Sequence, residues 1–125
     1  MALLREYLDP QTGQPLDPAA LRVGQVVRVR LTAVVGAQHS GLALEDPLPA
    51  GAELVSPGTG DFARATAAAG ALALERGASG PGIYQHSYLL RLVAAGRYGV
   101  PAATASAPGG GSGASSPATL EISAP

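Results

Sequence analysis

The sequence predicts an all-β fold, an antiparallel β-sandwich of seven or eight short strands. Three observations support this prediction. Apolar and polar residues alternate in several short segments, which is the pattern of a strand with one buried face. Clusters of glycine and proline separate these segments, and no segment carries a convincing helical period. Together these features are typical of sandwiches of the immunoglobulin-like type.

Length and composition indicate one globular domain, residues 1–125. Aromatic residues make up only 4% of the chain, so Val, Leu and Ala must fill the core. The formal net charge of −1 provides no basic field for nucleic acid. There is no cysteine for a disulfide, a thiolate nucleophile or a zinc site. No apolar run has the length needed for direct membrane insertion.

The first half of the chain contains the strand around which we expect the sheet to form. At residues 27–35 apolar residues alternate with Arg28, Arg30 and Thr32, so one face can be buried and the other solvated. Upstream, Asp17 is positioned to cap a single helical turn. Downstream, proline and glycine at residues 56–60 should break the chain. The strands predicted in this half are residues 3–8, 27–35, 42–46 and 52–55.

The second half contains the second-best alternation, residues 83–94. Both faces of this segment become apolar near its end, so we expect its second half to be covered on both sides. Residues 61–69 are rich in alanine without a clear apolar stripe, and we interpret them as irregular. Residues 106–117 have the Gly, Ser and Pro composition of a flexible loop. The strands predicted in this half are residues 71–76, 83–94, 98–100 and 118–122.

The two best alternating segments predict the centre of the core. Their inward-facing apolar residues are Val27, Val29, Leu31, Leu90 and Leu92.

Residues 46–51 are expected to end one strand and redirect the chain. Pro47 and Pro49 each lack a backbone N–H, so regular pairing should stop there. Gly51 is expected to take a positive φ, a conformation that a Cβ atom would penalise.

Few residues are candidates for catalysis. His39 and His86 are the only histidines, and neither has an acidic neighbour at the spacing of metal ligands, which favours a structural role. Glu45 and Asp46 are adjacent on a predicted strand, so they point to opposite faces and cannot act on one substrate. No serine lies in a nucleophile elbow, and the glycine-rich run lacks the helix and lysine of a phosphate loop. We therefore predict no enzyme activity and no catalytic, cofactor-binding or metal-binding residue.

Two arginines leave a choice open. Arg28 and Arg30 share one face of the strand at residues 27–35 and could bind an acidic partner. The alternative is an ordinary solvated sheet face.

Three stretches of the sequence, in order, carry a family resemblance. The first comprises residues 5–7, 13–16 and 21–32. Residues 45–53 are similar to an Asp-x-Leu-Pro-Ala-Gly-x-Glu signature, and residues 86–102 to a Tyr-x-x-Arg and Pro-Gly-x-Phe-x-Val-Pro-Pro ending. These motifs resemble the carboxy-terminal macroglobulin-type domain of bacterial alpha-2-macroglobulins. The family-motif residues on this interpretation are Asp46, Pro47, Pro49, Gly51, Glu53, Tyr88, Arg91, Gly96 and Pro101.

The resemblance implies a macroglobulin-like sandwich excised from the C-terminus of a larger protease-trapping inhibitor of the bacterial periplasm or cell surface. Its direct partners would be neighbouring domains of the parent protein, and target proteases would be engaged only indirectly. A reactive thioester would belong to another domain, because this chain has no cysteine.

The resemblance also implies an interdomain contact. In relatives a tyrosine that shields the thioester follows the Val-Pro-Pro ending, and that place falls here near Pro108 and Gly109, with no tyrosine after Tyr98. The expected contact residues are Tyr98, Pro108 and Gly109. The alternative function is a structural or adhesive sandwich module of a bacterial surface protein.

Overall fold

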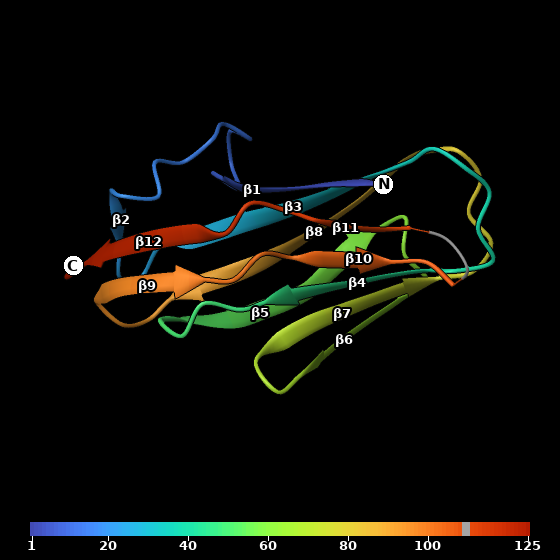
Figure 1. Ribbon diagram of the computed structural model, residues 1–125. Coiled ribbons are helices and arrows are strands. Elements are labelled where there is room, and N and C mark those ends of the chain that lie inside the picture. Colours follow the sequence, from blue (N-terminus) through green and yellow to red (C-terminus); the bar gives the residue numbers. More distant parts are fainter. Residues whose placement is uncertain (109–110) are drawn as a thin grey trace.

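Twelve β-strands and no helix make up the part of the chain that the computed structural model describes, residues 1–108 and 111–125 (Figure 1). The all-β prediction is confirmed. Eight of the strands correspond to predicted ones, and β2, β6, β10 and β11 are additional short strands. The strands are β1 (Ala2–Leu8), β2 (Leu21–Arg22), β3 (Val26–Val35), β4 (Leu42–Pro47), β5 (Ala52–Gly60), β6 (Arg64–Ala68), β7 (Ala71–Arg76), β8 (Gly82–Leu92), β9 (Gly96–Val100), β10 (Thr104–Ser106), β11 (Ser112–Ala114) and β12 (Ala118–Ser123).

The strands form three sheets. The four-stranded sheet has the order β1-β3-β8-β5, and the five-stranded sheet has the order β11-β10-β4-β7-β6. These two sheets pack face to face as the layers of the sandwich, with the four-stranded sheet at the back of Figure 1. A three-stranded sheet, β2-β12-β9, extends one end, and its β2–β12 pair is parallel.

The pairing of β3 with β8 forms the centre of the molecule. Val27 lies opposite Leu90, Val29 opposite Tyr88 and Leu31 opposite His86. All five residues predicted for the core are at most 1% exposed, which confirms that prediction. They divide between two clusters, however. Val27 and Leu92 pack with the three-stranded sheet, and the others lie between the two larger sheets.

The outer face of the four-stranded sheet is not covered by another layer of the described chain. The expectation that the end of β8 is covered on both sides is therefore wrong: Arg91 is exposed, and Val93 just beyond the strand is 45% exposed. The apolar residues on this face are surface residues rather than a second core.

β5 continues through residues 56–60, where the sequence predicted a break. Its pairing with β8 survives because two register shifts, between Leu54 and Ser56 and between Ser56 and Thr59, absorb extra residues as β-bulges. β5 is an edge strand, so Pro57 is tolerated there.

β6 replaces the irregular segment predicted at residues 61–69. Its alanines favour helix in isolation, but a tight turn at Ala69 (φ 52°) and Gly70 (φ 76°) folds β6 back onto β7. Two positive φ values at the centre of a two-residue connection are typical of a hairpin turn. Tertiary pairing therefore overrides alanine's helical preference.

Two further predictions are corrected by local hydrogen bonds. Asp17 does not cap a helix; its carboxylate accepts the Ala19 N–H (2.9 Å) within a turn. The predicted loop at residues 106–117 contains β11, which pairs with β10 at Ser112–Ala114.

Candidate functional site

The described residues bring no group of three His, Cys, Asp or Glu side chains into metal-binding proximity. His39 lies in a loop bridged to Ser79. His86, on β8, is buried, and its ring donates from Nε2 to the carbonyl of Pro57 on the neighbouring strand β5 (2.7 Å). In the same described part of the chain, no helix is long and apolar enough to cross a membrane.

The most organised polar group of the molecule surrounds Asp46. Asp46 is fully buried while its neighbour Glu45 is exposed, so the two carboxylates face opposite sides of β4, as predicted. Asp46 accepts the hydroxyl of Tyr88, which lies on β8 in the opposing sheet. Its other oxygen, Oδ1, lies 2.7 Å from Nη1 of Arg5 on β1. The structure thus brings two family-motif residues together with an arginine that the sequence analysis did not single out.

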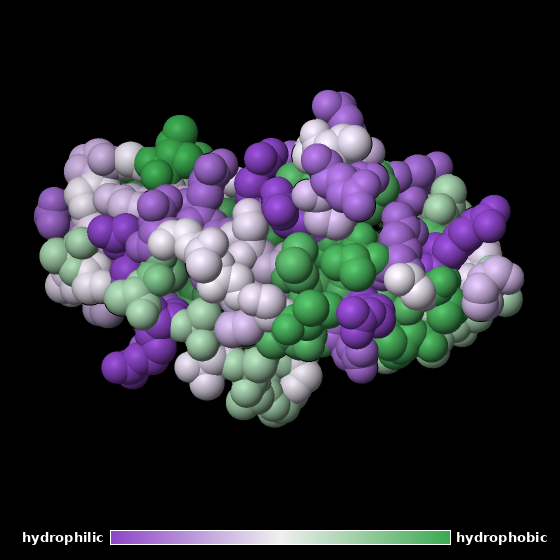
Figure 2. All heavy atoms as spheres, turned by 180° about the vertical axis from the view of Figure 1, so that it is seen from behind, coloured by the Kyte–Doolittle hydropathy of each residue, from purple (hydrophilic) through white to green (hydrophobic). Residues whose placement is uncertain are grey.

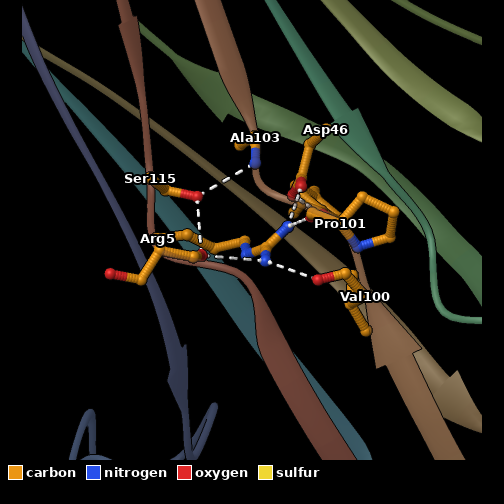
Figure 3. Close-up of polar contacts among 8 residues, drawn as sticks. Arg5, Asp46, Val100, Pro101, Ala103 and Ser115 are labelled. Atoms are coloured by element: carbon orange, nitrogen blue, oxygen red, sulfur yellow. Dashed lines mark hydrogen bonds and ion pairs between the residues drawn. The ribbon is translucent and has the colours of Figure 1, made fainter.

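The Arg5 guanidinium forms hydrogen bonds with backbone carbonyls on both sides of the β10–β11 segment (Figure 3). Nη1 donates to the carbonyl of Pro101 (2.8 Å), and Nη2 lies 3.5 Å from the Val100 carbonyl, just before β10. Nη2 also donates to the carbonyl of Ser116 (3.3 Å), just after β11. One buried side chain therefore holds the β9–β10 and β11–β12 connections together.

Ser115 completes the base of this hairpin. Its hydroxyl accepts the Ala103 N–H (2.9 Å) and donates to the Ser116 carbonyl (3.0 Å). Its own N–H donates to the Ala103 carbonyl (2.9 Å). We define the hairpin clamp as Arg5, Asp46, Tyr88 and Ser115. Because β10 pairs with β4 while β11 contacts β1, the clamped hairpin bridges the two layers of the sandwich.

Burial determines the protonation of this cluster. Removal from water raises the pKa of Asp46, and the Tyr88 and Arg5 hydrogen bonds oppose this shift only in part. Burial, and then the nearby charge of Asp46, raises the pKa of Tyr88 well above its ordinary value. Burial also raises the pKa of Tyr7, which is beside Arg5, to about 12. The Tyr88 hydroxyl therefore remains a donor throughout the neutral range.

The clamp is not arranged for chemistry on a substrate. Its ion pair is almost inaccessible, with side chains 1% and 0% exposed. A general acid or base must reach the proton it transfers, and Asp46 can reach only its own domain. The arrangement fixes the position of a chain segment.

Gly51 and Gly96, two other family-motif residues, form a slot for the ring of Tyr98. A Cβ on Gly51 would lie 2.4 Å from a ring carbon of Tyr98, and one on Gly96 would lie 3.1 Å from its hydroxyl. The Tyr98 hydroxyl lies 3.1 Å from the carbonyls of Ala94 and Ala95. The expectation of a positive φ at Gly51 is wrong, since Gly51 is not among the positive-φ glycines. This position is restricted by the close approach of an aromatic ring.

The remaining family-motif residues have visible local roles. Glu53 and Arg91 lie opposite each other on β5 and β8 and form an exposed pair at 3.3 Å. Pro47 ends β4, and the Pro49 carbonyl accepts the Ala52 N–H (3.1 Å) that leads into β5. Pro101 acts through its carbonyl, which Arg5 binds.

The structure does not bring the expected contact residues together. Tyr98 belongs to β9, at the left end of the molecule in Figure 1, and Pro108 follows β10 near the opposite end. Pro108 is exposed, whereas Tyr98 is half-buried in its glycine slot. Gly109 lies outside the described residues.

Arg5 could be found from sequence only indirectly. It occupies an inward position on an alternating strand, between Leu3 and Tyr7, where a charge requires a buried partner. That partner is 41 residues away, and no local pattern connects the two.

A family model supports a relationship over most of the chain. The model of the bacterial alpha-2-macroglobulin MG10 domain matches residues 1–108. Among curated proteins, none matches this sequence.

Solved structures share the fold. A mutant of Salmonella alpha-2-macroglobulin superposes with a TM-score of 0.81 at 22% identity, covering 98% of this chain and 9% of that chain. Escherichia coli alpha-2-macroglobulin activated by porcine elastase gives a TM-score of 0.82 at 19% identity, covering 97% of this chain and 13% of that one. A structure described as BspA_C_WT superposes with a TM-score of 0.68 at 12% identity, covering 95% of this chain and 50% of that chain. This chain therefore spans about a tenth of the alpha-2-macroglobulin structures it resembles.

Proposed function

The chain belongs to the bacterial alpha-2-macroglobulin MG10 domain family, and from that premise we propose that it is a non-catalytic domain of a larger protease-trapping inhibitor. The match of the MG10 model to residues 1–108 carries this proposal. Any thioester of the parent protein must lie outside this chain, which has no cysteine. The parent would act in the periplasm or at the cell surface.

The domain's contribution on this proposal is contact with neighbouring domains of the parent protein. The hairpin end around Pro108 is suited to that contact because its outer residues Ser106, Pro108 and Ser112 are exposed. The hairpin clamp holds the base of this segment at both ends. A loop fixed by a rigid scaffold loses less conformational entropy when it binds. We assign Tyr98 to the domain's own fold, because its ring and hydroxyl are engaged there.

The alternative, a structural or adhesive module, has weaker support. The likeness to BspA_C_WT at 12% identity concerns the fold alone. The family match instead favours a macroglobulin parent.

Binding in trans tests the proposed contact. The probe is the parent protein expressed without residues 1–125, titrated with the isolated chain. We expect Ser112→Arg, at the exposed hairpin end, to weaken binding at least about tenfold by placing a bulky charge in the contact. Ser123→Arg, on the exposed end of β12, is the matched control and should bind as the unmodified chain does. Deleting residues 109–115 is a poorer test, because it removes β11 and Ser115. Equal affinities for both variants would contradict the assignment.

A further inference from the structure

The outer face of the four-stranded sheet carries an arginine without an acidic partner. Arg30 binds Glu6 across β3 and β1 at 2.9 Å, and Arg91 binds Glu53 across β8 and β5 at 3.3 Å. Arg28 lies on β3 between these two pairs, opposite Leu89 of β8. Among the described residues, Arg28 forms no ion pair and donates no side-chain hydrogen bond.

The residual charge on this face is therefore localised. On these strands three arginines and two glutamates point outward, so their side chains carry one net positive charge. Because Arg30 and Arg91 each form an ion pair with a glutamate, that charge belongs to Arg28. The Asp61 carboxylate, beyond the end of β5, accepts the Gln85 N–H at 2.8 Å and lines an adjoining hollow, not the one at Arg28. The sequence left Arg28 and Arg30 equivalent, and the structure separates them.

Arg28 borders a hollow of about 420 Å³ beside the bulged part of β5. Side chains that can donate or accept hydrogen bonds line it, namely Arg28, Ser56, Thr59 and Ser87. Leu89 lies in the same wall, and Val55, the extra residue of the first bulge, is 43% exposed. Figure 2 shows the molecule from behind, with hydrophobic residues gathered near the middle of the face and hydrophilic ones beside them.

Three separate devices hold the bulge that opens this hollow. His86 donates to the Pro57 carbonyl (2.7 Å), and the Ser56 hydroxyl accepts the Gly58 N–H (3.2 Å). Gly58 has φ +83°, and a Cβ there would lie 1.8 Å from the Ser87 carbonyl oxygen. Because these contacts fix the bulge, we interpret it as a structural feature that the sequence encodes. β-Bulges are over-represented beside functional sites.

We propose that the hollow at Arg28 is a docking site for a carboxylate side chain, Asp or Glu, of another polypeptide segment that lies across β3 and β8. A guanidinium with neighbouring hydroxyls matches a carboxylate in charge and in hydrogen-bonding geometry. One residual positive charge matches a single carboxylate, whereas a phosphate dianion would also face Glu6 and Glu53 on the same sheet. The apolar wall at Leu89 favours a polypeptide, whose residues beside the acid can cover it.

This inference goes beyond the proposed function, because it concerns a different face from the hairpin end. The two can fail independently: loss of binding in Ser112→Arg reports on the hairpin, and loss of binding in Arg28→Gln reports on the hollow.

An NMR titration of the whole isotope-labelled chain tests the site. The probe is the capped tripeptide Ac-Val-Glu-Val-NH₂, and its matched control is Ac-Val-Gln-Val-NH₂. We expect saturable shifts of the Arg28 side-chain Nε–H and of the Ser56 and Ser87 amides with the glutamate peptide alone. Arg28→Gln should weaken that binding about tenfold or more, because a charge-assisted hydrogen bond is lost. Arg97→Gln, on β9 of another sheet, should leave it unchanged.

Three results would overturn the proposal. Equal chemical shift changes with the glutamine peptide would show that the site does not recognise the carboxylate charge. Larger shifts at Arg30 or Arg91 than at Arg28 would place the site elsewhere. Tighter binding of inorganic phosphate to the same residues would assign the hollow to a different class of ligand.

Discussion

Arg5 and Asp46 are 41 residues apart in the chain, yet their side chains meet at 2.7 Å in the interior, 1% and 0% exposed. A buried ion pair adds little stability compared with an apolar pair of the same shape, but removing one partner leaves an uncompensated charge. The pair therefore serves to specify a structure: it fixes β1 against β4 and aligns the guanidinium with carbonyls on both sides of the hairpin.

Arg5→Met should lower the free energy of unfolding by about 3 to 5 kcal/mol, because Asp46 loses its buried partner. Chemical denaturation measures this loss. The control, Arg64→Gln, breaks an exposed pair with Glu75 and should change stability by no more than about 0.5 kcal/mol. Similarly small changes in the free energy of unfolding for both variants would show that the hairpin clamp does not stabilise the fold.

Leu31→Ala and Leu90→Ala should each cost about 2 to 5 kcal/mol, because both side chains are at most 1% exposed in the central β3–β8 pair. Leu4→Ala, on the uncovered face of β1, is the matched control and should cost much less, since Leu4 is 54% exposed. Unchanged denaturation midpoints for both core variants would refute the assignment of the core.

Gly51→Val should destabilise the domain by more than about 1 kcal/mol, because its side chain would collide with the Tyr98 ring. Combining it with Tyr98→Ala should reduce the additional cost of the valine, since the obstructing ring is gone. Gly77→Ala, where a Cβ meets nothing within 4 Å, is the control. Fully additive effects of Gly51→Val and Tyr98→Ala would rule out the steric explanation.

Alkaline pH should destabilise the fold through its buried tyrosines. The folded-state pKa of Tyr7 is raised from 10.0 to about 12, and that of Tyr88 is raised further. The unfolded chain therefore releases these protons first, so the stability they contribute is complete below pH 10 and is lost as the pH rises toward 12. Phenolate absorbance followed with pH should show Tyr88 ionising only as the chain unfolds. The variant Tyr88→Phe should lack that late-titrating component, and an unchanged titration curve would contradict the burial argument.

The sequence predicts much of this fold because strand alternation is a local signal. β3 and β8 alternate over nearly their whole length, so their existence and inward faces follow directly. β6 was missed because alanine favours helix in isolation, and only the hairpin with β7 makes it a strand. The continuation of β5 does not follow from the sequence, because Pro57 and Gly58 favour the end of a strand. In the structure, β-bulges accommodate both residues.

The sites depend on long-range contacts and were harder to predict. The family motif pointed to Asp46 and Tyr88 but not to their shared hydrogen bond, and Arg5 entered only as part of a motif stretch. The sequence predicts correctly that a side chain is not tolerated at Gly51, but the reason is the Tyr98 ring and not a positive φ. A ring contributed by β9 cannot be inferred from the residues around the glycine.

Protease trapping can be measured with the full-length protein that would contain this domain. After incubation of trypsin with that protein, we expect the protease to hydrolyse a small peptide substrate still but to lose activity toward a large protein substrate. Residues 1–125 alone should affect neither substrate. Unchanged cleavage of the large substrate by trypsin in the presence of the full-length protein, or inhibition by the isolated domain, would refute the proposed role of a non-catalytic domain in a protease-trapping inhibitor.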